Sequence, residues 1–399
     1  MSKTIIFCAD GTWNGPGQDE EQEDQGGHPT NVFKVFLNLA GDLAVGTLRS
    51  ADEQERSLSG ADGRVTQIAK YLHGVGDSKN FLVRVLGGGG GAGLVTRIVR
   101  GYTFISRNFE PGDRIFIIGF SRGAYTARAL AGLIAARGLL DPGRNDLATD
   151  RAQAYRLGAA EWFTYRREAL KGKENLFHKL AEVAVDLPGF LQARATAPRI
   201  ADVPIEAVVV WDTVGALGIP AYNLKTDTQL DAFQFADLVL SGKVRHGLHA
   251  VSVDEQRASF TPTLWEADER ITQVLFPGAH ADVGGGYPQN ESGLSDCALQ
   301  WVVDEMTKLG VAFAPTPAVP LKPDACGMAH APWAQAPWNL LPRGQRGLPA
   351  GLAVHRSVPE RLGGGDRLRA AGLALYEPES LAAAYLSGGQ IKPGVRIIG

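Results

Sequence analysis

Residues 111–134 read PGDRIFIIGFSRGAYTARALAGLI, and this stretch decides the fold. The apolar run 114–120 predicts a buried strand, and the Ala-rich segment 123–137 predicts a helix. Between them lies a Gly-x-Ser-x-Gly turn centred on Ser121. A strand, this turn and a helix are typical of the nucleophile elbow of serine hydrolases, which exposes a hydroxyl above a helix N-terminus. We therefore predict Ser121 as a nucleophile, with a purely structural glycine turn as the alternative.

Short apolar runs alternate with segments of helical spacing along most of the chain. This alternation predicts an α/β fold with a mostly parallel central sheet and helices on both faces. We expect strands at 4–9, within 63–77, at 114–120, 205–211 and 271–278, helices at 31–44, 94–109, 123–137, within 231–252 and at 294–310, and loops at 14–30, 46–64 and 87–93.

The composition suggests two parts of unequal character. Residues 1–312 are predicted to form the catalytic domain, with residues 141–200 inserted as a helical cap. Residues 313–399 are predicted to be an extension that packs on the core, because residues 312–350 are rich in Ala and Pro and poor in regular patterns. The last residues, GVRIIG at 394–399, predict one more strand.

Four polar residues each stand just past a predicted strand end: Asp10, Ser121, Asp212 and His280. Parallel sheets present catalytic residues at the carboxyl ends of their strands, so these four are expected to share one site. A serine nucleophile needs a base, usually an imidazole, and His280 in FPGAHADVGGGYP is the best candidate. His246 and His249 are the rivals, but their spacing of three suggests one helix face and a packing role.

Asp212 is the preferred acid, since it follows the strong strand pattern IEAVVVW and completes the order Ser…Asp…His of α/β-hydrolases. Asp254 is the second candidate, although its neighbours Glu255 and Arg257 suggest an ion-paired cluster. Asp282 is too close in sequence to His280 to be an easy partner, but it could shape the loop.

An oxyanion hole should use the backbone N–H of Arg122, the residue after the nucleophile. Gly11, in the turn after the first strand, is the best second donor. A plain strand-exit turn is the alternative, in which Asp10 anchors the loops by accepting backbone hydrogen bonds. Chemistry of this kind needs no metal or cofactor.

Several other classes are disfavoured. A net charge of −3 without a long basic run argues against nucleic-acid binding. Three scattered cysteines, Cys8, Cys297 and Cys326, form no disulfide framework or metal knuckle. Gly88, Gly90 and Gly93 satisfy the dinucleotide pattern, but five consecutive glycines satisfy many patterns. Because we find no signal peptide or transmembrane run, we expect a cytoplasmic protein, and export by a route without a cleaved signal stays compatible with the sequence.

Longer motifs stand in a fixed order along residues 4–310. The chain resembles the DUF2235 family, which includes the catalytic domain of type VI secretion lipase effectors of the first class. The motifs that carry the resemblance are ADGTWN (9–14), TNVFK (30–34), GVGD (74–77), PGDRIFIIGFSRGAYTARALAGLI (111–134), VVWDTVGALGIP (209–220), HAVSVDEQRASFTP (249–262) and FPGAHADVGGGYP (276–288).

The resemblance implies an α/β-hydrolase fold, a triad at Ser121, Asp212 and His280, and ester hydrolysis through an acyl-enzyme. For the secreted members it implies phospholipid substrates and a transient contact with a membrane surface. An immunity protein or the secretion apparatus would be the partner of an effector. A general carboxylesterase for non-lipid substrates and a non-catalytic interaction module are the alternatives.

Overall fold

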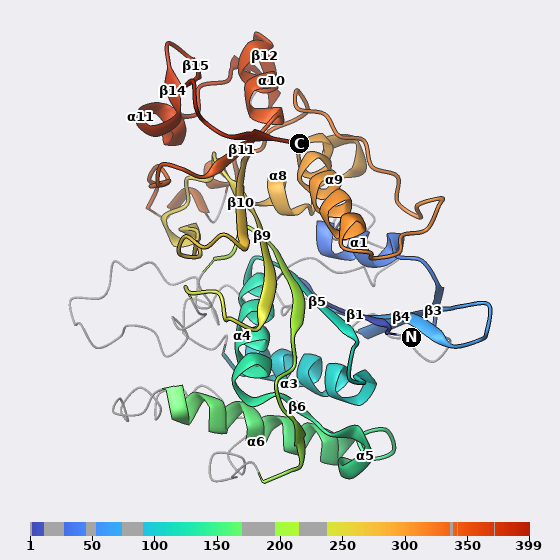
Figure 1. The fold of residues 1–399 in the computed structure, drawn as a ribbon. Helices are drawn as coiled ribbons and strands as arrows, with labels where there is room; N and C mark the ends of the chain where they lie inside the picture. Colours follow the sequence, from blue (N-terminus) through green and yellow to red (C-terminus); the bar gives the residue numbers. More distant parts are fainter. Residues whose placement is uncertain are drawn as a thin grey trace.

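The computed structural model describes residues 2–11, 28–44, 53–73, 91–169, 196–214, 238–335, 338–340, 342–370 and 372–399. A ten-stranded sheet crosses the molecule in the order β16-β11-β10-β9-β8-β5-β1-β4-β3-β2 (Figure 1). All neighbours from β16 to β4 are parallel, and β3 and β2 are antiparallel at one edge. The predicted α/β class with a mostly parallel sheet is therefore confirmed.

The strands of this sheet are β1 (Thr4–Ala9), β2 (Asp42–Leu43), β3 (Glu53–Ser59), β4 (Val65–Leu72), β5 (Arg114–Phe120), β8 (Ile205–Trp211), β9 (Val244–Ser252), β10 (Ile271–Phe276), β11 (Ala353–His355) and β16 (Ile397–Ile398). The sequence predicted β1, β4, β5, β8, β10 and β16 of this sheet but not β2, β3, β9 or β11.

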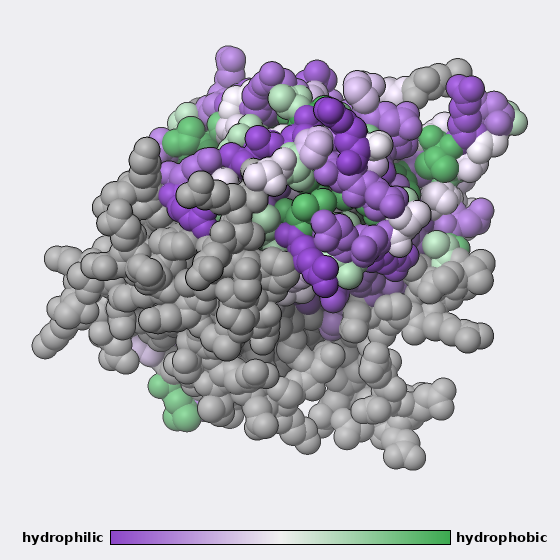
Figure 2. Space-filling view, turned by 90° about the horizontal axis from the view of Figure 1, so that it is seen from below, coloured by the Kyte–Doolittle hydropathy of each residue, from purple (hydrophilic) through white to green (hydrophobic). Residues whose placement is uncertain are grey.

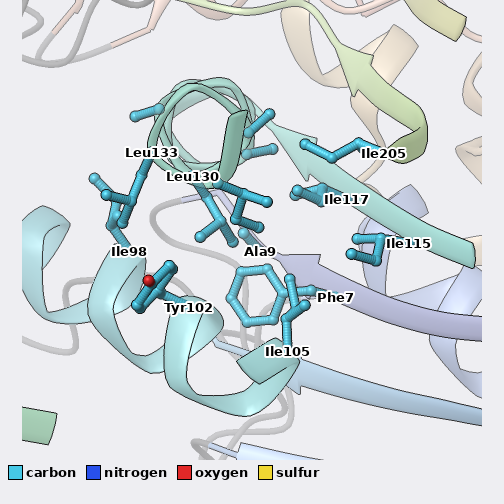
Figure 3. Packing of buried hydrophobic residues seen from close by; sticks show 14 of the residues in the cluster. Phe7, Ala9, Ile98, Tyr102, Ile105, Ile115, Ile117, Leu130, Leu133 and Ile205 are labelled. Carbon is cyan, nitrogen blue, oxygen red and sulfur yellow. The ribbon is translucent and has the colours of Figure 1, made fainter. Parts of the chain in front are cut away.

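Alternation along β5 divides the core into two layers, because successive side chains of a strand point to opposite faces. Ile115 and Ile117 belong to one buried cluster, and Phe116, Ile118 and Phe120 belong to the other. Figure 3 shows the first cluster, in which Ile117 and Phe7 face Leu130 and Ile105 from two helices. Because the sheet is buried on both faces, the sequence of β5 is a continuous apolar run.

Helices cover both faces of the sheet (Figure 1). The helices α3 (Gly91–Asn108), α4 (Arg122–Arg137), α5 (Pro142–Asn145) and α6 (Arg151–Ala169) lie on the first cluster's side, and α1 (Asn31–Asn38), α8 (His280–Gly284) and α9 (Gly293–Lys308) on the second's. Within the predicted cap, α6 packs against α3 and α4. A short ladder of β6 (Leu139–Leu140) and β7 (Arg199–Ile200) joins its two ends. Residues 170–195 lie outside the described residues, so the cap itself stays a prediction.

Three expected elements were wrong. The segment 231–252 was expected to be helical, yet its described part contains β9, because the run from Val244 to Ser252 is buried as a strand between β8 and β10. The expected loop 46–64 contains β3, whose polar residues are accommodated by an edge position. The helix expected at 31–44 ends at Asn38 and is followed by β2. The glycine loop expected at 87–93 is described only from Gly91, which already begins α3.

The C-terminal residues join the core rather than only covering it. Here β11 and β16 form one edge of the sheet, which places the predicted strand at 394–399. A third buried cluster contains Val251, Leu275 and Val354. The remaining elements are α10 (Ser357–Gly363), β12 (Asp366–Arg369), β13 (Gly372–Leu375), α11 (Ala382–Tyr385), β14 (Leu386–Ser387) and β15 (Gln390–Ile391). Within 312–350 the described residues hold no helix beyond short 3-10 turns, as expected.

The hydropathy of the described surface and helices bears on contact with a membrane. On the face shown in Figure 2, the described residues are mainly hydrophilic, with hydrophobic residues between them in small groups. Among the described helices, none combines the length and the apolar character needed to cross a bilayer.

Candidate active site

Ser121 occupies the sharp turn between β5 and α4. Its backbone has φ 58° and ψ −121°, a strained conformation for a residue with a side chain. A Cβ on Gly119 would lie 2.2 Å from the Gly123 carbonyl oxygen, and one on Gly123 would lie 2.1 Å from the Ala9 carbonyl oxygen. Both glycines of the motif are thus required by close backbone packing, which is the geometry of a nucleophile elbow.

Asp212 and His280 meet beside this turn. Asp212 follows β8 with φ 36°, and His280 begins α8 just after β10. The carboxylate Oδ2 lies 2.5 Å from His280 Nδ1, and its Oδ1 accepts a hydrogen bond from the Ser252 N–H at 2.9 Å. Because Nδ1 faces the carboxylate, Nε2 is the ring nitrogen available to accept a proton from a nucleophile.

Electrostatics keep this pair in the charge state that a base needs. Burial lowers the pKa of His280 below its ordinary value of 6.5, although the bond to Asp212 acts in the opposite direction. For Asp212, burial alone would raise the pKa. The charge of Arg346 and the bond to His280 outweigh it and hold that pKa well below its usual range. A neutral imidazole beside an ionised carboxylate results at neutral pH.

Arg346 is a member of the site that the sequence did not suggest. Its guanidinium donates to Asp212 Oδ1 at 2.6 Å and to Oδ2 at 2.8 Å. It also donates to the carbonyl oxygens of Ser252 at 2.9 Å and Phe260 at 2.7 Å. The chain has 40 Lys and Arg residues, and a Gly-Gln-Arg-Gly segment without regular structure carries no pattern that would select this one.

Aromatic side chains surround His280. Its ring lies 4.6 Å from the Phe120 ring and 4.9 Å, edge-on, from the Phe260 ring, measured between centroids. Trp338 packs edge-on against Phe260 at 5.4 Å, and the Arg257 guanidinium stacks 3.6 Å above Phe260.

The Glu255–Arg257 cluster expected from the sequence is ion-paired, and it is buried. Glu255 Oε2 accepts from Arg257 Nη2 at 2.8 Å and from the His280 backbone N–H at 3.2 Å. This pair therefore holds the start of α8 in place.

The predicted oxyanion donors lie next to Ser121. Arg122 is the first residue of α4, so its N–H is directed out of the helix N-terminus. A Cβ at Gly11 would lie 3.3 Å from Ser121 Cβ, which places the turn after β1 against Ser121. In this structure, however, the Gly11 N–H donates to Asp10 Oδ1 at 2.6 Å.

Asp10 anchors this part of the site. Its carboxylate also accepts from Tyr71 Oη at 2.7 Å and from Thr30 Oγ1 at 2.8 Å. Burial raises the pKa of Asp10 to about 6, against these hydrogen bonds, which lower it. The loop-anchoring interpretation matches these contacts.

The expectation for His249 was wrong in its local structure. His246 and His249 lie on β9 and not on one helix face. His249 is fully buried, and its Nε2 accepts from the Thr213 N–H at 3.1 Å while Nδ1 faces Gln273 Oε1 at 3.3 Å. Burial lowers the pKa of His249 to about 3, so the ring is a neutral support for the turn after β8.

Asp254 and Asp282 hold the loop that carries His280. Asp254 accepts from the Gly278 N–H at 2.6 Å and from Tyr376 Oη, and it does not contact His280. Burial raises the pKa of Asp254 to about 6. Asp282 accepts from the Ala279 N–H at 2.9 Å, and its Oδ1 lies 2.6 Å from His330 Nδ1.

His330 is a second residue from the C-terminal segment that the sequence did not suggest. Its Nε2 lies 3.0 Å from Glu291 Oε2, and its ring stacks on Tyr287 at 3.4 Å between centroids. No group of three or more His, Cys, Asp or Glu that could hold a metal ion is found in the described part of the chain.

Comparison with known proteins places the chain in a family. The family described as "T6SS, Phospholipase effector Tle1-like, catalytic domain" matches residues 3–305. The uncharacterized protein YEL023C of Saccharomyces cerevisiae is 28% identical over 272 residues, which is 65% of this chain and 32% of that protein. The chain thus spans about a third of the length of that curated relative.

Two solved structures are also similar. One is the Tle1 effector bound to the VgrG spike of the type 6 secretion system, with 17% identity, a TM-score of 0.38 and coverage of 72% of this chain and 52% of that one. The other is an uncharacterized protein from Pseudomonas aeruginosa, with 18% identity, a TM-score of 0.38 and coverage of 78% and 46%.

Proposed function

The chain belongs to the family of T6SS phospholipase effector Tle1-like catalytic domains, and from that membership we propose that it is a serine hydrolase of phospholipid esters. One observation carries the proposal most directly. Ser121 stands in a strained elbow at the end of β5, and the Asp212–His280 pair stands at the ends of β8 and β10 in the same sheet.

In the first step, Ser121 Oγ attacks the ester carbonyl carbon while His280 Nε2 takes the hydroxyl proton. Asp212 holds the tautomer with the proton on Nδ1 and stabilises the imidazolium that forms. When the tetrahedral intermediate collapses, the same proton passes from Nε2 to the leaving alcohol, and an acyl-enzyme remains. Water, activated by His280, then releases the fatty acid and restores Ser121.

Backbone dipoles at the start of α4 supply the oxyanion stabilisation. The Arg122 N–H is the first donor, and the positive end of the helix dipole adds to it. Gly11 is the second donor, and its N–H must exchange Asp10 Oδ1 for the oxyanion when substrate binds.

A lipid substrate is favoured by the apolar side chains next to His280. Phe260 packs edge-on against the imidazole, and Trp338 packs edge-on against Phe260. Leu340, two residues further on, is 82% exposed, and we include in the proposal a transient contact of this side chain with a membrane surface. As a member of this family, the chain would have the secretion apparatus and an immunity protein as its partners.

Fluorophosphonate labelling tests the nucleophile. Wild-type protein should be labelled and should hydrolyse a short soluble ester, and Ser121→Ala should lose both. Ser387→Ala, which removes an exposed serine from β14, is the matched control and should behave as wild type. Equal labelling of wild type and Ser121→Ala would remove Ser121 from the mechanism and favour a non-catalytic interaction module.

Phospholipid vesicles test the substrate class. We expect the wild type to release fatty acid from vesicles faster than it cleaves the short soluble ester at equal ester concentration. Hydrolysis of the soluble ester without release from vesicles would favour a general carboxylesterase.

A further inference from the structure

We propose that Arg346 is a positioning residue of the acid–base pair, supplied by the C-terminal segment from outside the matched family domain. Arg346 lies 134 residues after Asp212 and beyond residue 305, where the family match ends. The inference rests on the proposed hydrolase function and adds a requirement to it, namely that residues 3–305 hold an incomplete site.

The geometry is that of a fixed clamp. Both terminal nitrogens of the guanidinium bind the Asp212 carboxylate as a fork, and each also binds a backbone carbonyl oxygen. The side chains of Arg346 and Asp212 are 3% and 0% exposed. A planar fork of this kind fixes both the position and the rotation of a carboxylate, which a lysine cannot do.

The two carbonyl contacts extend the clamp to the walls of the site. The Ser252 carbonyl ends β9, and the Ser252 N–H binds Asp212 on its other side. The second carbonyl oxygen belongs to Phe260, whose aromatic ring packs edge-on against the His280 ring. The Arg346 guanidinium therefore links Asp212 to Phe260, the residue that packs against His280.

The charges around His280 show what this clamp does to the base. Asp254 and Asp282 bind backbone N–H groups of the loop that carries His280. Other described charged side chains around His280 include Asp212, Glu255, Arg257 and Arg346. They form two neutralised pairs, Glu255 with Arg257 and Asp212 with Arg346. Because Asp212 and Glu255 each have a guanidinium partner, their charges are compensated, and burial keeps the resting imidazole neutral. Arg346 thus keeps Asp212 ionised and aligned while His280 stays neutral and ready to accept a proton.

Arg346→Met and Arg346→Lys in the full chain test this role, with the short soluble ester as substrate. For Arg346→Met we expect kcat to fall roughly 10- to 100-fold with KM changed less than about twofold, short of the ~10⁴-fold loss that follows replacement of a triad carboxylate. The acid limb of kcat/KM should move to higher pH, because an uncompensated Asp212 charge raises the pKa of His280. Arg346→Lys, which keeps the charge, should restore the position of the limb and only part of kcat.

Arg361 provides the matched control. It is fully buried in the same C-terminal segment and donates to the carbonyl oxygens of Ala325 at 2.9 Å and Gly327 at 2.8 Å. Arg361→Met should lower the melting temperature and leave kcat per active site and the pH profile unchanged. Active-site titration with the fluorophosphonate corrects every kcat for the folded fraction, and Arg346→Lys carries the test if Arg346→Met does not fold.

The outcomes separate the two proposals. If Ser121→Ala is inactive but the folded Arg346 variants keep the wild-type kcat and pH profile, Arg346 is only structural and the inference is overturned while the hydrolase function stands. If Arg346→Met and Arg361→Met change kcat and the limb alike, the effect is general destabilisation and the inference is again overturned. A wild type without Ser121-dependent hydrolysis would instead overturn the proposed function.

Discussion

Two regions of this molecule build one site in opposite ways. The segment from β5 to α4 is contiguous, regular and held by backbone packing, so the position of Ser121 follows from Gly119 and Gly123 beside it. Residues 313–350 have little regular structure, yet Arg346 and His330 from them hold Asp212 and Asp282 through side-chain bonds. The difference shows that the position of Ser121 is fixed locally, whereas Asp212 and the loop that carries His280 depend on a distant part of the chain.

Among the changes that test this comparison, Asp212→Asn should have the largest effect on activity and stability. An amide cannot accept the Nδ1 proton as a carboxylate does, so kcat should fall roughly 10⁴-fold. Arg346 is also left as an unpaired buried charge, which should cost roughly 3–5 kcal/mol in the free energy of unfolding. Ester hydrolysis and urea denaturation measure the two effects.

The double variant Asp212→Asn with Arg346→Met is the control for the second effect. It should recover part of the lost stability without any recovery of activity, because the buried charge is gone and the acid is still missing. Equal stability of the single and double variants would contradict a direct Asp212–Arg346 coupling.

The same glycine-to-alanine change should act differently at the turn after β5 and at the end of α10. In Gly123→Ala the new methyl group would lie 2.1 Å from the Ala9 carbonyl oxygen, so the backbone would have to shift at a cost in free energy. We expect a loss of roughly 1–3 kcal/mol in the free energy of unfolding together with reduced activity. At Gly363, at the end of α10, a Cβ meets nothing within 4 Å. Gly363→Ala should be neutral or stabilising by up to about 1 kcal/mol. Thermal denaturation of both variants decides, and an equal cost would contradict the claim of local backbone constraint.

His330→Gln should give the smallest effect, and one that depends on pH. Burial lowers the pKa of His330, but Asp282 and Glu291 outweigh it and raise the pKa above its ordinary value of 6.5. The stability from protonated His330 is therefore fully present below pH 6.5 and is lost as pH rises through the raised value. We expect the variant to cost about 1 kcal/mol at pH 6 and less at pH 9.

The measurement for this prediction is the gap in melting temperature between wild type and variant at the two pH values. The gap should narrow as the pH rises, and a gap of equal size at both would contradict a charged His330. His28→Gln, at an exposed position, should show no gap at either pH.

Much of the scaffold could be predicted because its signals are short-range. The strands carrying Asp10, Ser121, Asp212 and His280 are apolar runs flanked by turn residues, and the structure brings the last two into contact and places the turn after the first against Ser121. The catalytic roles of these residues stay predictions. The error at 231–252 arose because β9 is buried on both faces, so its pattern has no strict alternation.

The supporting residues could not be predicted for a different reason. Arg346, His330, Tyr71 and Thr30 act at positions set by how distant segments pack, and no spacing rule links them to the motifs. The two candidate carboxylates likewise differ in contacts that only the folded chain shows, since Asp254 binds Gly278 and Tyr376 while Asp212 binds His280.

The sequence by itself determined the α/β class, the elbow at Ser121 and the set of strand-end residues, because local backbone sterics and strand periodicity are written in neighbouring residues. Only the tertiary structure decided which carboxylate faces His280, that Asp10 binds the Gly11 N–H, and that Arg346 clamps Asp212. A buried charge needs a partner of opposite charge. Which residue becomes that partner depends on how the chain packs in space and not on the order of residues along it.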